Sequence, residues 1–368
     1  MNFLRLVILS LGAAMIAGCG DGKLGPPPTP TPGPGNAFIF TANAGGNSIS
    51  GFKNDSTGAL TPVSGSPFGS PGQPFGLAAS NGFLYVSSFQ NAVVSVFTIN
   101  STTGSLTPVT CTPAASTGPQ PLKIAITPNG KFLYTSNQGG NVSGFTINTG
   151  TGCLTAVSTT LADSVPRGLT VERTGQFLYV VTGGGGIDVF AINVDGTLTR
   201  QSLAGFNSLT GTMLAVKASP TTDVMIATDG GNANNFITFI INTNNGIITP
   251  ITASAATTLA PSAIAYNTVA DPNNPAFYIA NTGSNNFTAS SIAPNGAPNS
   301  AAAVVPVSTG PVDLASDPSG KFVYIANNGS STVSVFNANI TTGNVNSVFI
   351  GSANTGSGPE SIVVVGHP

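Results

Sequence analysis

PLKIAITPNGKFLYTSNQGGNVSGFTI, residues 121–147, is the stretch that decides the fold. A proline opens a short apolar strand, an Asn-Gly turn follows, and the strand KFLYTSN leads through a Gly-Gly turn to the strand NVSGFTI. Asn-Gly and similar glycine turns supply the positive φ angles that tight hairpins need. A Thr-Gly turn then leads to a fourth strand. The stretch therefore predicts one antiparallel sheet of four short strands.

This unit recurs seven times along the chain. An apolar residue, aromatic in six of the seven units, stands at the head of each second strand, and successive heads are 45 to 53 residues apart: Phe38, Phe83, Phe132, Phe177, Val224, Phe277 and Phe322. A period of this size with four strands per unit is typical of a β-propeller. Because one unit cannot bury both faces of its sheet, the units must pack around an axis. We expect an all-β, seven-bladed propeller.

The two ends of the repeat region predict how the ring closes. The repeats begin on a second strand, AFIFTAN (37–43), and finish on an unpaired first strand, PESIVVVGHP (359–368). One blade is then built from residues 36–68 together with 360–366, and this pairing removes the two strand edges that an open ring would expose.

Three motifs resemble a known family. PNGKFLY, TGALTPVSGSPF and the YIAN segments are similar to the seven-bladed lactonase family, typified by 6-phosphogluconolactonase, and to the related YVTN-repeat propellers of microbial surfaces. The resemblance covers about residues 36–366. It implies the propeller fold and the possibility of lactone hydrolysis, but each motif is a strand or a turn rather than a set of reactive groups.

The first 35 residues predict a lipid-anchored envelope protein. Residues 1–18 have a basic start and a short apolar core, as in a signal peptide, and they end in small residues before Cys19, which resembles the lipidation site of bacterial lipoproteins. In the lipoproteins that this segment resembles, an aspartate directly after the cysteine favours the inner membrane; Gly20 holds that place here, with Asp21 one further on, so the resemblance favours the outer membrane. Residues 19–35 are proline-rich and predict an extended tether, so residues 36–368 form the propeller domain. The lipid would be the protein's only contact with the membrane.

Charge is scarce in this chain. Charged residues make up 6% of it and the net charge is −2, which excludes a basic surface for nucleic acid. The only histidine, His367, is next to the C-terminus, so a Ser–His–Asp triad is not expected. No metal-binding motif is present, and no cofactor is predicted, although a divalent ion such as Ca²⁺ stays open. We expect a monomer.

Two residue types have alternative interpretations. Cys111 and Cys153 could form a disulfide in an oxidising envelope, but alignment of the fourth strands places them about 20 Å apart along the strand direction, which favours two buried thiols.

Asn43, Asn137, Asn281 and Asn327 recur at the ends of second strands. They either form a ring of amides on one face or, as we expect, cap the next turn through their own backbone.

The candidate site consists of charges that follow the leading proline of each first strand, where the chain enters the central channel. These pairs of positions are Phe75-Gly76, Leu122-Lys123, Arg167-Gly168, Met213-Leu214, Ser262-Ala263, Val312-Asp313 and Glu360-Ser361. Four of the seven carry a charge, in a chain with few charges. We expect Lys123 and Arg167 to face Asp313 and Glu360 across the channel mouth. The alternative is that these charges only pair with one another and hold the register of the ring.

Two functions are compatible with these residues. The favoured one is an envelope module that binds a small sugar-like ligand, a glycan or an envelope protein on the propeller face. The other is a lactonase, a carboxylic-ester hydrolase. In that case Asp313 or Glu360 would activate water, and Lys123 or Arg167 would bind the substrate or stabilise the oxyanion.

Overall fold

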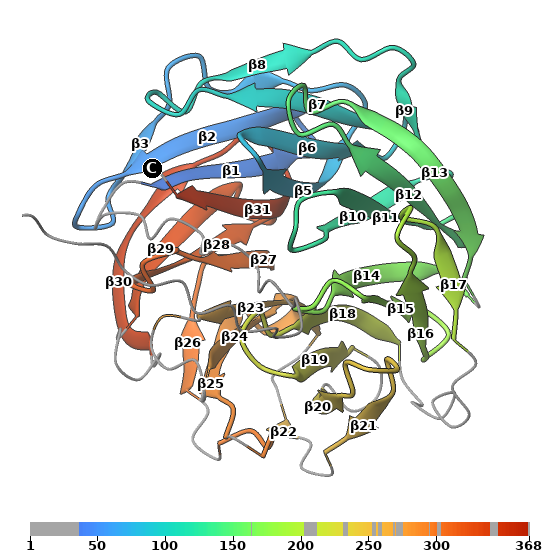
Figure 1. Ribbon diagram of the computed structural model, residues 1–368. Helices are drawn as coiled ribbons and strands as arrows, with labels where there is room; N and C mark the ends of the chain where they lie inside the picture. Colours follow the sequence, from blue (N-terminus) through green and yellow to red (C-terminus); the bar gives the residue numbers. More distant parts are fainter. Residues whose placement is uncertain are drawn as a thin grey trace, which may run out of the picture.

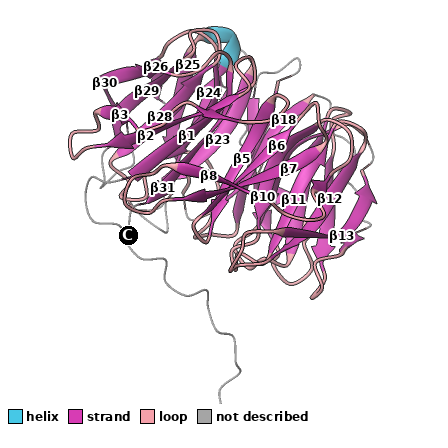
Figure 2. Ribbon diagram, turned by 90° about the horizontal axis from the view of Figure 1, so that it is seen from above, coloured by secondary structure: helices cyan, strands magenta, loops and turns pink. Residues whose placement is uncertain are grey.

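The computed structural model is a closed ring of seven antiparallel sheets (Figures 1 and 2). It describes residues 37–366, apart from gaps at 163, 202–211, 231–234, 252–254, 257–259, 268, 270–274, 294, 300–302 and 339–344. The predicted signal peptide and tether, residues 1–35, lie outside the described residues. Within the described part of the chain, no helix is long and apolar enough to cross a membrane.

Each sheet has four strands in chain order from the axis outward, except that blade 1 takes its innermost strand from the C-terminus. The innermost strands of blades 1–7 are β31 (Pro359–Gly366), β5 (Pro74–Ser80), β10 (Pro121–Ile126), β14 (Pro166–Val171), β18 (Met213–Ala218), β23 (Pro261–Asn267) and β27 (Pro311–Ser316). The second strands are β1 (Ala37–Asn43), β6 (Phe83–Ser88), β11 (Phe132–Asn137), β15 (Phe177–Thr182), β19 (Val224–Asp229), β24 (Ala276–Asn281) and β28 (Phe322–Asn327).

The third strands are β2 (Ser48–Asn54), β7 (Val93–Ile99), β12 (Asn141–Ile147), β16 (Ile187–Ile192), β20 (Asn235–Ile241), β25 (Asn286–Ser291) and β29 (Thr332–Ala338). The outer strands are β3 (Leu60–Pro62), β8 (Leu106–Val109), β13 (Leu154–Leu161), β17 (Leu198–Arg200), β21 (Ile248–Pro250), β26 (Ala303–Pro306) and β30 (Val345–Asn354). Short outer segments extend three blades: β4 (Phe68–Gly69), β9 (Ala115–Ser116) and β22 (Ala255–Ala256). A single 3₁₀ turn, η1 (Thr282–Ser284), completes the described elements.

The predicted fold and the predicted closure are both confirmed. β31 pairs with β1 along its whole length, from Ala37 opposite Gly366 to Asn43 opposite Pro359. The N-terminal and C-terminal ends of the domain therefore share one sheet, blade 1 (Figure 1).

The recurring aromatic heads are the contacts that join one blade to the next. A glycine in the turn between the third and outer strands lies on the head residue of the preceding blade. A Cβ at Gly152 would lie 2.5 Å from Phe83, and one at Gly104 would lie 2.4 Å from Phe38. The same contact closes the ring, because Gly58 of blade 1 lies against Phe322 of blade 7. Each of these glycines has a positive φ, so the turn requires glycine both for its conformation and for this close approach.

Buried tyrosines two residues after the heads add hydrogen bonds across the same boundaries. Tyr134 donates to the carbonyl of Gly196 at 2.9 Å, and Tyr179 donates to that of Gly246 at 3.0 Å. At the ring closure, Asn54 donates to the hydroxyl of Tyr324 at 2.9 Å. The second strands, with sequences such as FLYT and FLYV, thus supply both the apolar core and the polar links between blades.

The recurring asparagines have neither of the two expected roles. Asn43, Asn137, Asn281 and Asn327 are fully buried, so they form no exposed ring of amides. Their amide groups donate mainly to side chains of the third strand of the same blade, as from Asn43 to the hydroxyls of Ser48 and Ser50. The prediction that they cap the turn through backbone two residues on was therefore wrong. A buried amide is stabilised by such partners: Asn43 and Asn327 have two hydroxyls, whereas Asn137 and Asn281 have one hydroxyl and one asparagine side-chain oxygen.

The prediction of two free thiols was also wrong. Cys111 and Cys153 form a disulfide with a Cα–Cα distance of 5.6 Å. The spacing argument treated the outer strands of blades 2 and 3 as parallel copies, but strands in a sheet twist, and the outer segment β8–β9 of blade 2 lies against β13 of blade 3. Cys111 and Leu154 consequently line the same hollow at the boundary between these blades.

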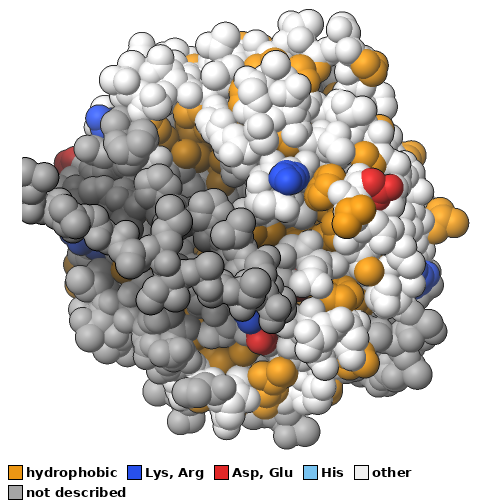
Figure 3. All heavy atoms as spheres, in the orientation of Figure 1, with side chains coloured by type: hydrophobic (Ala, Val, Ile, Leu, Met, Phe, Trp, Pro, Cys, Tyr) orange, Lys and Arg blue, Asp and Glu red, His pale blue; other side chains and the backbone are white. Residues whose placement is uncertain are grey.

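The low charge of the sequence is visible on the surface. Figure 3 shows one face of the ring, where apolar and uncharged polar atoms surround a few charges. Arg173 and Asp223, which follow the innermost strands of blades 4 and 5 in the chain, form an ion pair at 2.7 Å in which both side chains are well exposed.

Candidate functional site at the channel mouth

The innermost strands begin at one face of the ring, which we call the mouth face. At their third position these strands approach one another closely. A Cβ at Gly76 would lie 2.2 Å from the carbonyl oxygen of Leu122, and one at Gly168 would lie 3.0 Å from the Cα of Ala215. Small side chains therefore occupy five of the seven positions of this ring: Gly76, Gly168, Ala215, Ala263 and Ser361. The two exceptions are Lys123 and Asp313.

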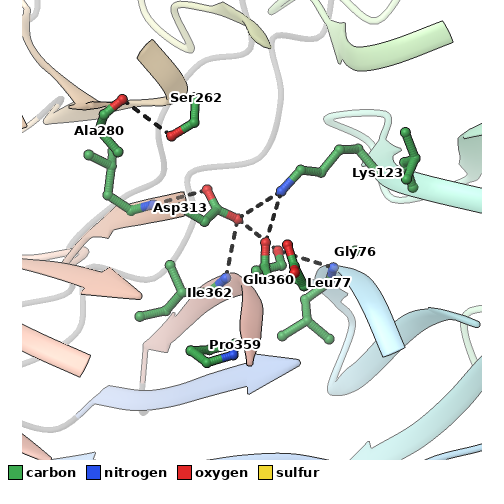
Figure 4. A network of polar contacts seen from close by, with 12 residues as sticks. Gly76, Leu77, Lys123, Ser262, Ala280, Asp313, Pro359, Glu360 and Ile362 are labelled. Atoms are coloured by element: carbon green, nitrogen blue, oxygen red, sulfur yellow. Dashed lines mark hydrogen bonds and ion pairs between the residues drawn. The ribbon is translucent and has the colours of Figure 1, made fainter. Parts of the chain in front are cut away.

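Lys123 and Asp313 meet each other across the channel. Lys123 extends from β10 in blade 3 to β27 in blade 7, and its Nζ lies 3.3 Å from Asp313 Oδ2 (Figure 4). The same Nζ donates to the backbone carbonyl of Glu360 in blade 1 at 3.2 Å. Only 30% of the Lys123 side chain and 16% of the Asp313 side chain are exposed. The sequence prediction that Lys123, Asp313 and Glu360 converge describes this arrangement.

Asp313 is held by donors on both carboxylate oxygens. Besides Lys123, Oδ2 accepts hydrogen bonds from the hydroxyl of Ser361 at 2.8 Å and from the backbone N–H of Ile362 at 3.2 Å. Oδ1 accepts from the N–H of Leu314 at 3.0 Å. Four donors thus occupy the two carboxylate oxygens. Asp313 is therefore suited to hold the Lys123 ammonium in place rather than to remove a proton.

Glu360 has a different environment at the same mouth. Its Oε1 accepts a hydrogen bond from the side chain of Asn328 at 2.8 Å, whereas Oε2 accepts none from the described residues. Burial raises the pKa of Glu360, with Lys123 opposing this shift, Asp313 adding to it and the Asn328 hydrogen bond opposing it. Glu360 thus combines a free oxygen with a raised pKa, the properties of a general base.

Arg167 does not join this cluster. Its Nε is buried without a hydrogen-bond partner, and a Cβ at Gly183 in the turn between β15 and β16 would lie 3.3 Å from it. The side chain therefore lies over the glycine turn of its own blade, on the mouth face. We expected both Lys123 and Arg167 to face Asp313 and Glu360. Lys123 does so, and Arg167 does not.

Lys217 is a channel residue that the sequence analysis missed. It lies on β18, two residues further into the channel than Ala215 of the narrow ring. Its side chain is accessible from the channel, although the innermost strands surround it. The strands that surround it displace bulk water, and this burial lowers the pKa of Lys217, while Asp313 opposes the shift and Lys123 adds to it. The innermost strand of blade 5 begins with Met213, where those of the other six blades begin with proline. The sequence repeat therefore did not show at which level of the channel Lys217 lies.

Metal-binding side chains do not gather anywhere in the described residues, where no group of three or more His, Cys, Asp or Glu side chains could hold an ion.

Comparison with known proteins places this geometry in a family. The family model for the lactonase, a seven-bladed β-propeller, matches residues 108–208 and 233–356. The chain belongs to the lactonase family. Lys123, Arg167 and Asp313 lie within the matched segments of this lactonase-family propeller, whereas Lys217 and Glu360 lie outside them.

Solved structures agree on the fold of the lactonase-family propeller. A Bacteroides uniformis protein provisionally named a 6-phosphogluconolactonase is 19% identical with a TM-score of 0.76, covering 90% of this chain and 100% of that one. The periplasmic gluconolactonase PpgL of Pseudomonas aeruginosa is 17% identical with a TM-score of 0.74, covering 91% and 100%. At such identities the likeness concerns the fold alone. A comparison with curated proteins finds no match.

Proposed function

We propose that this lactonase-family propeller hydrolyses the ring ester of a sugar lactone at the channel mouth. The observation that carries the proposal is Glu360, a carboxylate with a free oxygen and a raised pKa, next to the Lys123 ammonium that Asp313 holds in place. The similarity in fold to a periplasmic gluconolactonase supports this choice of substrate class. This proposal differs from the interpretation that the sequence alone favoured, which was a non-catalytic binding module.

The chemistry assigns one role to each group. Glu360 would accept a proton from the water that attacks the lactone carbonyl. Lys123 would stabilise the negative charge that develops on the carbonyl oxygen, and Asp313 would act as a positioning residue for Lys123. The ring C–O bond then breaks, and the alkoxide takes a proton to give the open hydroxy acid.

The experiment is a hydrolysis assay on gluconolactone with and without a 6-phosphate, corrected for spontaneous opening and run with and without Ca²⁺. Glu360→Gln should lower kcat by about 10²–10⁴-fold, the usual contribution of a general base, and Lys123→Met should lower kcat/KM. Lys131→Met, at an exposed turn on the opposite face, is the matched control and should leave both unchanged. Full activity in the Glu360→Gln variant would exclude this mechanism.

Ligand binding without catalysis is the second candidate, and the engagement of Asp313 favours it. If both carboxylates serve the ring alone, the mouth carries no reaction, and the uncharged polar faces would bind a glycan or an envelope protein. Binding to a glycan array with no hydrolysis of any lactone would select this function.

Envelope anchoring through Cys19 is part of the proposal. The mature protein should partition into detergent and begin at Cys19, and Cys19→Ser should abolish both properties. Recovery of the wild-type protein from the aqueous phase would exclude the lipid anchor.

A further inference from the structure

Among the described innermost strands, Lys217 is the only charged side chain at its level of the channel. The strand register places it opposite Ile226, and the matching positions of the other six innermost strands are Ala78, Ala125, Thr170, Ala265, Ala315 and Val363. Apolar or small side chains thus surround one primary amine. The amine is exposed to the channel and makes no hydrogen bond or ion pair with the described residues.

The charges around Lys217 come from strands across the channel. The narrow ring of Lys123 and Asp313 lies two residues nearer the mouth, about 7 Å along the strand direction, and Glu360 and Arg167 lie beside that ring at the mouth face. Asp313 and Lys123 act on the charge of Lys217 in opposite directions. A lysine held in apolar surroundings near a second cation keeps more of its amine neutral and nucleophilic at neutral pH, which agrees with the lowered pKa of Lys217.

From this placement we propose that Lys217 is a covalent binding site for small neutral aldehydes, including the open-chain form of a sugar. Nζ bonds to the carbonyl carbon while a proton moves from nitrogen to oxygen, which gives a carbinolamine. The C–O bond then breaks with loss of water, and a reversible imine remains. No oxidant or reductant takes part.

A neutral carbonyl fits this position better than an anion does. A ligand that comes from the mouth passes two carboxylates, Asp313 and Glu360, and two cations, Lys123 and Arg167, so the mouth has no net positive charge to attract an anion. At the level of Lys217 the described channel wall consists of methyl groups and the Thr170 hydroxyl, which is buried and accepts a hydrogen bond from Ala218 N–H, and the nearest second cation, Lys123, lies nearer the mouth. The proposal is independent of lactone hydrolysis, because it uses neither Glu360 nor Lys123 as a reacting group.

The test is reductive labelling of the full chain at pH 7 with glyceraldehyde and cyanoborohydride, followed by peptide mapping. Because the chain has few lysines, each can be followed separately. Lys217 should be modified several-fold faster than exposed Lys131, because the lowered pKa of Lys217 leaves more of its amine neutral at pH 7. Lys217→Arg keeps the charge and should abolish the fast phase, whereas Lys131→Met should keep it. Melting temperatures of both variants check that they are folded.

Two results would overturn the proposal. One is labelling of Lys217 at or below the rate of Lys131. The other is the behaviour of an anion site, in which inorganic phosphate raises the melting temperature of the wild type but not of Lys217→Arg, and glyceraldehyde gives no fast phase.

Discussion

Replacement of Asp313 by asparagine tests whether the Lys123–Asp313 pair holds the ring together. The amide removes the counter-charge of Lys123. It also places an NH₂ group against either Leu314 N–H or the three donors on Oδ2, so at least one hydrogen bond is lost whichever way the amide turns. Exposed ion pairs contribute up to about 1 kcal/mol and breaking buried ones costs about 3–5 kcal/mol. With 30% and 16% exposure, we expect a loss of about 2–3 kcal/mol.

The assay is equilibrium unfolding in urea at neutral pH, at low and at moderate salt. Asp223→Asn is the matched control, because Asp223 pairs with Arg173 at 2.7 Å but both side chains are about 40% exposed. That variant should lose less than about 1 kcal/mol. The double variant Lys123→Met/Asp313→Asn gives the coupling between the pair. A loss for Asp313→Asn no greater than for Asp223→Asn would refute this reasoning.

Three further predictions concern the ring. Replacing Cys111 and Cys153 by serine opens a loop with a sequence separation of 42 residues and should lower the unfolding free energy by about 4 kcal/mol in the chain-entropy model; an unchanged urea midpoint would contradict it. Gly152→Ala, with φ +75° and a Cβ 2.5 Å from Phe83, should lose about 2–4 kcal/mol, against about 1–2 kcal/mol for Gly140→Ala, where the space is open; equal losses would contradict the blade contact. Removing residues 359–368 takes β31 from blade 1 and should abolish cooperative unfolding; a truncated protein with the wild-type melting temperature would disprove closure by the termini.

Much of the fold could be predicted because the repeat carries it. The head residues and the turn glycines recur at fixed offsets, and the structure places Phe83 against Gly152 and Phe38 against Gly104 in the same way. A periodic contact of this kind leaves a periodic trace in the sequence. The closure of the ring followed from counting strands, and β31 pairs with β1 as counted.

Contacts between blades were predicted less well where they depend on twist. The disulfide joins outer strands of adjacent blades, and a distance measured along one strand cannot give the separation of two strands that are inclined to each other. The recurring asparagines were placed correctly, but their partners are hydroxyl and amide oxygens on the third strand, and only the register brings those together.

The site was predicted in part for a related reason. Lys123 and Asp313 stand two residues after a leading proline and Glu360 stands one residue after, which fixed their level in the channel. Arg167 stands one position earlier than Lys123 relative to the second strand and lies over Gly183. Lys217 has no leading proline in its blade, and its place in the channel emerges only from its pairing with Ile226.

The pH dependence of lactone hydrolysis tests the central claim most directly. A base whose pKa is raised is ionised only at higher pH, so kcat/KM of the wild type should rise with pH through an inflection above 4.5, the ordinary value for Glu360. The measurement is a pH-stat titration of gluconolactone opening with the spontaneous rate subtracted, for the wild type and for Glu360→Gln. We predict that the inflection disappears in Glu360→Gln together with most of the activity. The same inflection and the same rate in both proteins would contradict the assignment of Glu360 as the base.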